Sequence, residues 1–250
     1  MIYIDNLTVF NGVELSRWVL VDDIKRPVQP KRRLTTTLAP GQQVPYMSVE
    51  GYEPYTITLH ARLRKHALAD IPACRNALSA ALIVDEPKRL LLPDDVTRSY
   101  LAMYQGDDAI TISESKTELT LSFLIVDPIA YGATHELTIT DGDKHEVVVG
   151  GTQPTYPRFT IDASHASGTV GIVITKYGAD DVPDKLVKIS ASAGVIIVDM
   201  ERERAYTQGA SAARIDLSSD FFALTDGDKV RIACNASSWS ARMSWEERYV

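Results

Sequence analysis

The chain has 250 residues, enough for one or two domains that each bury a full-sized core. Apolar residues make up 45% and charged residues 24%, a balance typical of a folded globular protein and not of a disordered or membrane chain. The formal net charge is −7 and the basic residues are mostly scattered, which argues against tight nucleic acid binding, because phosphate neutralisation needs concentrated positive charge.

The opening residues and the cysteines bear on the compartment. Residues 1–12 have neither a basic start nor a sustained apolar run, and no later apolar segment approaches the ~18 residues of a membrane span. We therefore expect intracellular synthesis without export and no membrane span. Cys74 and Cys234 lie in apolar patterns far apart in sequence, which predicts buried free thiols and not a disulfide or a reactive site.

Residues 25–55, here called the arm, differ from the rest of the first half. Prolines and glycines interrupt them repeatedly, and they contain polar runs such as RRLTTTLAPGQQ. A loop of this length is uncommon in a compact domain unless it has a function. We expect the arm to contact a partner, and the alternative is a mobile surface loop.

Two strands and one helix are predicted after the arm. Residues 56–63 alternate apolar and polar side chains, the pattern of a strand with one solvent-facing side, and residues 118–126 begin in the same way before turning apolar on both faces. We expect these strands to be neighbours in one sheet. Residues 70–84 repeat apolar side chains at three-and-four spacing, with Asp70 placed to cap the first turn, which predicts a helix packed on that sheet.

The second half predicts short strands only. A composition shift follows Tyr131 and Gly132, and residues 150–157 form a further turn-rich break. The strand signals lie at residues 158–161, 170–175, 185–190, 195–200, 214–217, 229–233 and 243–250. Regular short strands separated by turns indicate a sandwich or jelly roll. The fold class is therefore mainly β with one helix (α+β), in two domains, 1–132 and 133–250.

The common signatures of chemistry are missing from the sequence. The five histidines show neither HxH nor HExxH spacing, and neither cysteine belongs to a CxxC pair, so no metal site is predicted. No GxGxxG, GxxxxGK(S/T) or GxSxG pattern occurs, which removes the usual support for a bound cofactor, for phosphate binding and for a nucleophilic serine. We predict no catalytic residue, no cofactor and no enzyme.

Three weaker patterns have two readings each. Residues 141–143 and 226–228, both Asp-Gly-Asp, could belong to calcium loops but lack the further spaced ligands, so turns explain them better. Glu201, Glu203, Glu246 and Glu247 could be paired glycosidase acids, whereas residues 201–204 more simply form a charged strand end or hairpin. Trp239 and Trp245 could stack on a sugar, whereas a tryptophan in a strand more often lies in a core or an interface.

Several segments along the chain form a recognisable series. The first half contains Phe10-Asn11-Gly12, the strand at 56–63, the helix, and FLIVDPIAYG at 123–132. The second half contains VIIVDMERERAYTQGA at 195–210, DLSSDFFALTDGDKVRI at 216–232 and the ending SWEERYV at 244–250. In their order and spacing, these segments resemble the distal tail protein, or baseplate hub ring protein, of long-tailed siphophages or prophages of Gram-positive bacteria.

The resemblance implies a structural protein of the phage tail tip. Residues 1–132 would form a ring (hub) domain whose copies associate into a homo-hexamer, and residues 133–250 a galectin-like β-sandwich (jelly roll). The ring would join the major tail tube protein to the tail-tip (tail-associated) protein, and would be a docking hub for receptor-binding or other baseplate proteins. Its place would be the virion tail tip, after assembly in the host bacterial cytoplasm.

A closed ring needs a patch on each copy that fits a different patch on the next. We predict such oligomer contacts at Arg33, Pro40 and Gly41 in the arm, and at Thr58 and His60 on the following strand.

The competing hypothesis is a carbohydrate-binding adhesin module, in which the C-terminal domain contacts the host cell surface through Trp239 or Trp245. A glycan-degrading enzyme is a third possibility, which requires acids distant in the sequence to converge in the fold.

Overall fold

The computed structural model describes residues 6–38, 40–41, 43–64, 70–106, 110–112, 117–209 and 213–250. Its contacts divide the chain into two compact units. The N-terminal unit comprises Met1–Tyr131 with Val250, and the C-terminal unit comprises Gly132–Tyr249. The division after Tyr131 lies at the composition shift in the sequence, and the functions assigned to the two domains stay predictions.

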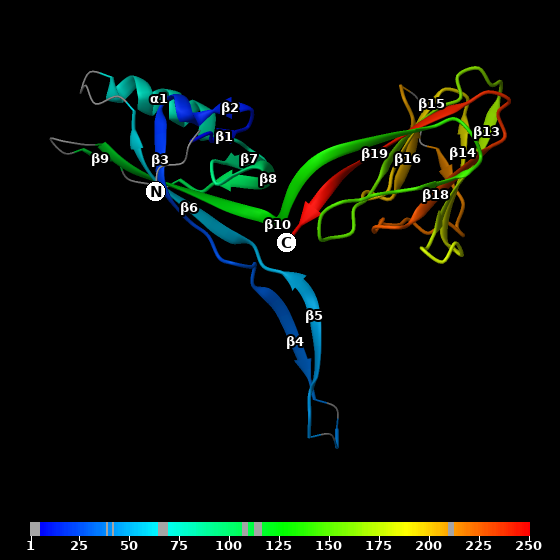
Figure 1. The fold of residues 1–250 in the computed structure, drawn as a ribbon, viewed down its shortest axis with the longest axis horizontal. Coiled ribbons are helices and arrows are strands. Elements are labelled where there is room, and N and C mark those ends of the chain that lie inside the picture. The colour runs from blue at the N-terminus through cyan, green and yellow to red at the C-terminus, as the bar shows by residue number, and fades with distance from the viewer. Residues whose placement is uncertain are drawn as a thin grey trace. The chain divides into compact units, whose positions relative to one another are not determined.

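The N-terminal unit is built on one antiparallel sheet, in the order β3-β6-β10-β8-β7-β1-β2, with β9 also paired to β10 (Figure 1). Its strands are β1 (Val9–Phe10), β2 (Val13–Glu14), β3 (Val19–Lys25), β6 (Tyr55–Leu63), β7 (Lys88–Leu92), β8 (Asp95–Tyr104), β9 (Ile110–Ile112) and the first part of β10 (Thr117–Ile139). A short 3-10 turn, Leu15–Arg17, precedes β3. The two strands predicted to be neighbours are paired as β6 and β10, with Leu59 opposite Leu121.

The motif Phe10-Asn11-Gly12 forms a tight hairpin between β1 and β2. Phe10 pairs with Val13, which leaves a two-residue loop whose residues Asn11 and Gly12 both have positive φ, 52° and 74°. Asn-Gly is the sequence that such a loop favours, because both positions must adopt left-handed backbone angles. The loop directs Phe10 into the core, where its ring lies 5.2 Å from that of Phe123.

The predicted helix is confirmed as α1 (Ile71–Leu82), whose buried side chains are Ile71, Cys74, Leu78, Ala81 and Leu82. Asp70 was expected to cap the first turn through its carboxylate, and this was wrong. Asp70 has helical backbone angles and makes no side-chain capping bond, and its carbonyl oxygen accepts the first helical bond from the Cys74 N–H at 3.0 Å. The backbone alone therefore begins the helix.

The arm was expected to be a loop and instead contains a β-hairpin. Strands β4 (Arg32–Thr37) and β5 (Tyr46–Tyr52) form a two-stranded sheet of their own, paired from Arg32 opposite Tyr52 to Thr37 opposite Tyr46 (Figure 1). A register shift between Arg32 and Leu34 places a bulge near its base. The prolines and glycines of the arm all lie outside the paired residues, with Gly51 of β5 at the bulge, and so do not break the hairpin.

The C-terminal unit is a sandwich of two antiparallel sheets (Figure 1). One has the order β16-β15-β12-β19 followed by the last part of β10, and the other has the order β11-β18-β13-β14-β17. The strands are β11 (Lys144–Glu146), β12 (Arg158–Asp162), β13 (Thr169–Tyr177), β14 (Pro183–Ser192), β15 (Val195–Asp199), β16 (Arg204–Thr207), β17 (Arg214–Ile215), β18 (Lys229–Cys234) and β19 (Ser240–Tyr249). Every strand predicted for this half is present.

One hydrophobic core lies between these two sheets. Phe159 of β12 and Met243 of β19 come from one sheet, and Ile174 of β13 and Ile232 of β18 from the other, and all four are fully buried. The alternation of inward apolar and outward polar residues along each strand produces this arrangement. The mainly β fold with one α-helix in the described residues is therefore confirmed.

The two cysteines are free thiols in different units. Cys74 is buried on the inner face of α1, as predicted, whereas Cys234 at the end of β18 is only partly buried. The strand end lies at the edge of the core, so the apolar pattern around Cys234 overstated its burial.

Candidate interaction surfaces

The hairpin of the arm has one apolar face. Residues opposite each other on paired strands share a face, and Leu34 lies opposite Val49 while Thr36 lies opposite Met47. Residues two apart along a strand also share a face, so all four lie on the same side of the hairpin. The relative exposures of Leu34, Met47 and Val49 are 50%, 65% and 55%. We call these three residues the apolar strip. An isolated two-stranded hairpin is only marginally stable in water, so the strip is a surface that gains stability when it is covered.

The predicted arm contacts lie elsewhere on the hairpin. Arg33 alternates with Leu34 along β4 and so shares the opposite, polar face with Thr35. Pro40 and Gly41 follow β4 towards the tip, and both are exposed. All three side chains are accessible to a partner, and their function in assembly stays a prediction.

Ion pairs hold the base of the arm. The Arg26 guanidinium lies 2.6 Å from an Asp94 carboxylate oxygen and donates a hydrogen bond of 2.9 Å to the Tyr100 hydroxyl. Further out, Lys31 pairs with Glu53 at 2.9 Å, and the Glu53 N–H donates to the Lys31 carbonyl. Arg26 therefore ties the start of the arm to the β7–β8 turn.

Two tyrosines beside this base are shielded from water. Burial raises the pKa of Tyr55 to about 12, and burial also raises the pKa of Tyr100 against the opposing effect of Arg26. Both phenols stay neutral over any physiological pH, so Tyr100 accepts the bond from Arg26 without titrating. No sequence pattern indicated this cluster, because its members are separated by dozens of residues.

Thr58 and His60 lie on the outer face of β6, opposite the buried Ile57 and Leu59. The His60 Nδ1 atom is 3.5 Å from the Thr120 hydroxyl, while its buried Nε2 atom has no hydrogen-bond partner in the described part of the chain. A buried polar atom without a partner costs about 1–3 kcal/mol, which an acceptor on another surface can recover.

The same face continues to Arg62, which pairs with Asp22 at 3.3 Å through NH2. Its buried Nε also has no partner among the residues that the structure describes. His60, Asp22 and Glu118 help to line a shallow hollow of about 320 Å³. The structure thus brings Thr58 and His60 to one surface that has unpaired buried nitrogen atoms, and the binding of a second copy there stays a prediction.

The two tryptophans occupy different environments. Trp245 is 8% exposed, its indole N–H donates to the Val149 carbonyl at 3.3 Å, and its ring stacks on His135 at 5.5 Å. Trp239 packs against the edge of the same core and is only partly buried. Trp245 therefore has no free ring face for a sugar in this structure, and Trp239 retains some exposed ring surface.

The ending SWEERYV is explained by contacts inside the C-terminal unit. Glu247 accepts hydrogen bonds from His135 Nε2 and the Tyr249 hydroxyl, both at 2.8 Å, and a longer one from the Ala133 N–H. The bonds from His135 and Tyr249 hold the pKa of Glu247 below its usual range. The strand β19 pairs with β12, so the C-terminal unit receives the terminal strand.

The acidic residues considered for catalysis or calcium have structural partners. Glu201 pairs with Arg248, and residues 200–203 form the turn of the β15–β16 hairpin, which is the simpler of the two readings. Asp226 accepts the Val149 N–H at 2.7 Å, and Asp228 accepts the Thr225 N–H at 2.7 Å. These are turn contacts, and the described residues contain no group of three or more potential metal ligands.

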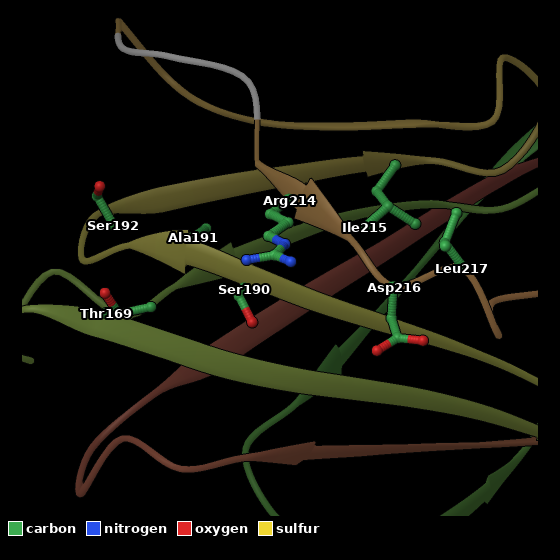
Figure 2. Close-up of a pocket in the computed structure, with 8 residues that line it drawn as sticks. All are labelled: Thr169, Ser190, Ala191, Ser192, Arg214, Ile215, Asp216 and Leu217. Carbon is green, nitrogen blue, oxygen red and sulfur yellow. The ribbon is translucent and has the colours of Figure 1, made fainter.

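A hollow on the C-terminal unit lies over β13, β14 and β17, with a volume of about 880 Å³ (Figure 2). We call it the β14 groove, and its lining residues are Thr169, Ser190, Ala191, Ser192, Arg214, Ile215, Asp216 and Leu217. No motif in the sequence marked it, because three separate segments build it.

Among the described residues, no helix is both long and apolar enough to cross a membrane. Residues 150–249 match the family model of the siphovirus-type tail component, C-terminal domain. No curated protein matches the sequence.

The fold is similar to three solved structures. The SPP1 Dit (gp 19.1) protein, described as a hub of the adsorption apparatus in phages that infect Gram-positive bacteria, has a TM-score of 0.77 at 16% identity, over 98% of this chain and 99% of that one. A chain of the phage P2 baseplate in its activated conformation with Ca has a TM-score of 0.56 at 9% sequence identity, over 95% of this chain and 96% of that one. A chain of the same baseplate with Sr has a TM-score of 0.51 at 10% sequence identity, over 90% of each chain.

These matches confirm the resemblance to distal tail proteins that the motifs indicated. The family model covers most of the C-terminal unit, and the likeness to Dit extends the same fold over both units.

Proposed function

We propose that this chain is a structural, non-catalytic subunit of the tail-tip baseplate of a long-tailed phage, where it forms the hub. The observation that carries the proposal is the fold match along nearly the whole chain to SPP1 Dit, together with the family match of residues 150–249 to a siphovirus tail component. The similarity to a chain of the phage P2 baseplate supports the same assignment.

In this proposal six copies close into a ring through the N-terminal unit. The apolar strip of the hairpin and the outer face of β6 at Thr58 and His60 supply contacts between copies, with Arg33, Pro40 and Gly41 at the periphery of the arm. Both surfaces leave favourable interactions unmade in the described part of a single chain: exposed apolar area on one, and unpaired buried polar atoms on the other.

The ring joins the tail tube protein to the tail-tip protein, and its outer surface docks receptor-binding or other baseplate proteins. Assembly takes place in the host bacterial cytoplasm and the finished ring lies at the virion tail tip. The net charge of −7 supports passage of DNA through such a ring, because like charge does not retain the phosphate backbone.

Size-exclusion chromatography with light scattering tests the ring directly. Six copies of the 27.6-kDa chain would have a mass of about 166 kDa. The experiment is run over a range of concentrations, alone and with the tail tube and tail-tip proteins. A chain that stays monomeric at high concentration in every mixture contradicts the ring.

The competing function, a carbohydrate-binding adhesin acting through its tryptophans, has less support. Trp245 belongs to the core, and only Trp239 has exposed ring surface. A Trp239→Ala variant on a glycan array measures this function separately. Glycan binding by the wild-type chain that is lost in the Trp239→Ala variant would favour the adhesin.

A further inference from the structure

The β14 groove combines unpaired polar groups in a way that the scaffold function does not require. Arg214 of β17 lies opposite Ser190 of β14, so the two side chains share the outer face of the sheet. Figure 2 shows the Arg214 guanidinium directed over β14 towards Ser190. In the described part of the chain, no hydrogen bond or ion pair engages this guanidinium.

The floor of the groove supplies hydroxyl groups. Ser190 and Ser192 point outward from β14, and Thr169 of β13 pairs with Ser192. None of these three hydroxyls has a hydrogen-bond partner among the described residues. Gly171 lies opposite Ser190 on the other side and has no side chain to fill the space. The result is a hollow lined by free donors and acceptors.

The other end of the groove carries the opposite charge in a rigid turn. Asp216 Oδ1 accepts the N–H and the hydroxyl of Ser218, at 2.9 and 2.7 Å. Those bonds hold the pKa of Asp216 below its usual range, and the charges of Lys188 and Arg214 lower it further. The bonds leave Oδ2 of Asp216 open to accept. The Asp216 N–H donates to the Lys188 carbonyl at 3.0 Å, which fixes the turn onto β14.

We propose that the β14 groove binds an oxyanion that carries neighbouring hydroxyl groups, that is, an anionic carbohydrate or polyol. Arg214 would hold the oxyanion in a two-pronged contact, which its planar guanidinium suits. The hydroxyls of Thr169, Ser190 and Ser192, with Oδ2 of Asp216, would exchange hydrogen bonds with the ligand hydroxyls. None of the described residues that line the groove is aromatic, so a neutral sugar would lack the stacking surface that usually holds it there.

This inference goes beyond the proposed assembly function and does not depend on it, because every group lies in the C-terminal unit. A phosphate ester of a polyol and a sugar carboxylate share the required chemistry. Glycerol phosphate represents the first source and glucuronate the second, and the tighter ligand identifies which source the groove fits.

The full chain is titrated with glycerol phosphate, glucuronate, inorganic phosphate and neutral methyl glucoside, by isothermal calorimetry or by NMR. We expect saturable binding of at least one hydroxylated anion at about millimolar concentration. Methyl glucoside and inorganic phosphate should each bind at least about tenfold more weakly, because each lacks half of the recognised groups. Absence of saturable binding, or equal binding of the neutral sugar, overturns the proposal. Equal binding of inorganic phosphate points to an adventitious ion only and overturns it too.

Two variants locate the binding, with one matched control. Arg214→Gln should weaken binding by about tenfold or more, since it removes the charge-assisted contact. Arg242→Gln removes the same charge from β19, in the other sheet, where the side chain is 64% exposed, and should leave binding unchanged. Equal weakening by both variants would show a general charge effect and refute the site.

The second variant, Gly171→Val, adds a side chain next to Ser190, which lines the groove, without removing a charge. A Cβ at Gly171 would make only ordinary contacts, the nearest at 3.5 Å from Asn235. This variant should keep the melting temperature of the wild type and lose binding by about tenfold or more. Retained binding in a folded Gly171→Val protein would place the ligand outside the groove.

Discussion

At the scale of single residues, the important contacts of this protein join residues that are far apart in the sequence. Arg26 reaches Asp94 and Tyr100, and Glu247 accepts from His135. Each pair combines a charged group with a partner brought close only by strand pairing. Sequence patterns could identify the strands but not these pairs, because the two members of each pair are too far apart in the sequence to form a motif.

Arg26 should contribute more to stability than the neighbouring ion pair of the arm. Arg26 is one-third exposed and Asp94 less so, whereas Lys31 is 78% exposed. We expect Arg26→Ala to lower the free energy of unfolding by about 1–2 kcal/mol. Lys31→Ala should cost less than about 0.5 kcal/mol, since water screens exposed pairs. Urea unfolding measures both. Equal losses would show that Arg26 does not anchor the arm.

Glu247 should make the C-terminal unit sensitive to acid. Its pKa is lowered in the folded protein by the bonds from His135 and Tyr249, so its stabilising effect is present above the ordinary pKa of 4.5 and is lost as the pH falls through the folded value. We therefore expect Glu247→Gln to lower the melting temperature at pH 7 and to differ less from the wild type at pH 3.

Scanning calorimetry at the two pH values measures this difference for Glu247→Gln. Glu136→Gln is the matched control, because Glu136 is 56% exposed and lies 3.9 Å from Arg242. It should change the melting temperature little at either pH. A difference for Glu247→Gln that stays constant from pH 7 to pH 3 would contradict the assignment.

At the scale of elements, long periodic segments were predictable and irregular ones were not. The helix and the strand β6 follow from periodicity alone. The strand β10 has 23 residues, yet only 118–126 were predicted, because Asp127 and Pro128 look like a strand end. Register shifts on either side of Asp127 absorb the proline, and the Asp127 carboxylate accepts the Tyr131 hydroxyl. The strand therefore continues into the second unit.

We expect the apolar strip of the hairpin to contribute to self-association, because a second copy would bury its exposed apolar area. Replacing all three of its residues, as Leu34→Ser, Met47→Ser and Val49→Ser together, should therefore weaken self-association at least about tenfold. Light scattering across a concentration series measures the shift. The control changes the polar face of the same strands, as Thr35→Ser and Ser48→Thr, and should leave the association unchanged.

An oligomer that is unaffected by the strip variant would place the subunit contact elsewhere. The outer face of β6 would then be tested next, with His60→Ala against Thr56→Ser as its control on the same face.

At the scale of the whole molecule, the division into two units was visible in the sequence and the candidate sites were not. The break at Tyr131 and the regular strands beyond it indicated a second, β-only unit. The β14 groove, in contrast, combines Thr169, Ser190 and Arg214, small or isolated polar residues without any motif. Trp239 and Trp245, which the sequence offered as candidates for sugar stacking, lie in or against the core. Residue type alone did not distinguish these environments.

The C-terminal unit should fold alone, provided that it keeps its last strand. All members of its core lie between Leu137 and Trp245, and β19 lies between β12 and β10 in the sheet. We expect residues 132–250 to give a cooperative melting transition by circular dichroism. Residues 132–239 lack β19, which removes Met243 and Trp245 from the core and exposes both neighbouring strands, so this fragment should show no cooperative transition. Equal melting of the two fragments would mean that SWEERYV is not part of the sandwich.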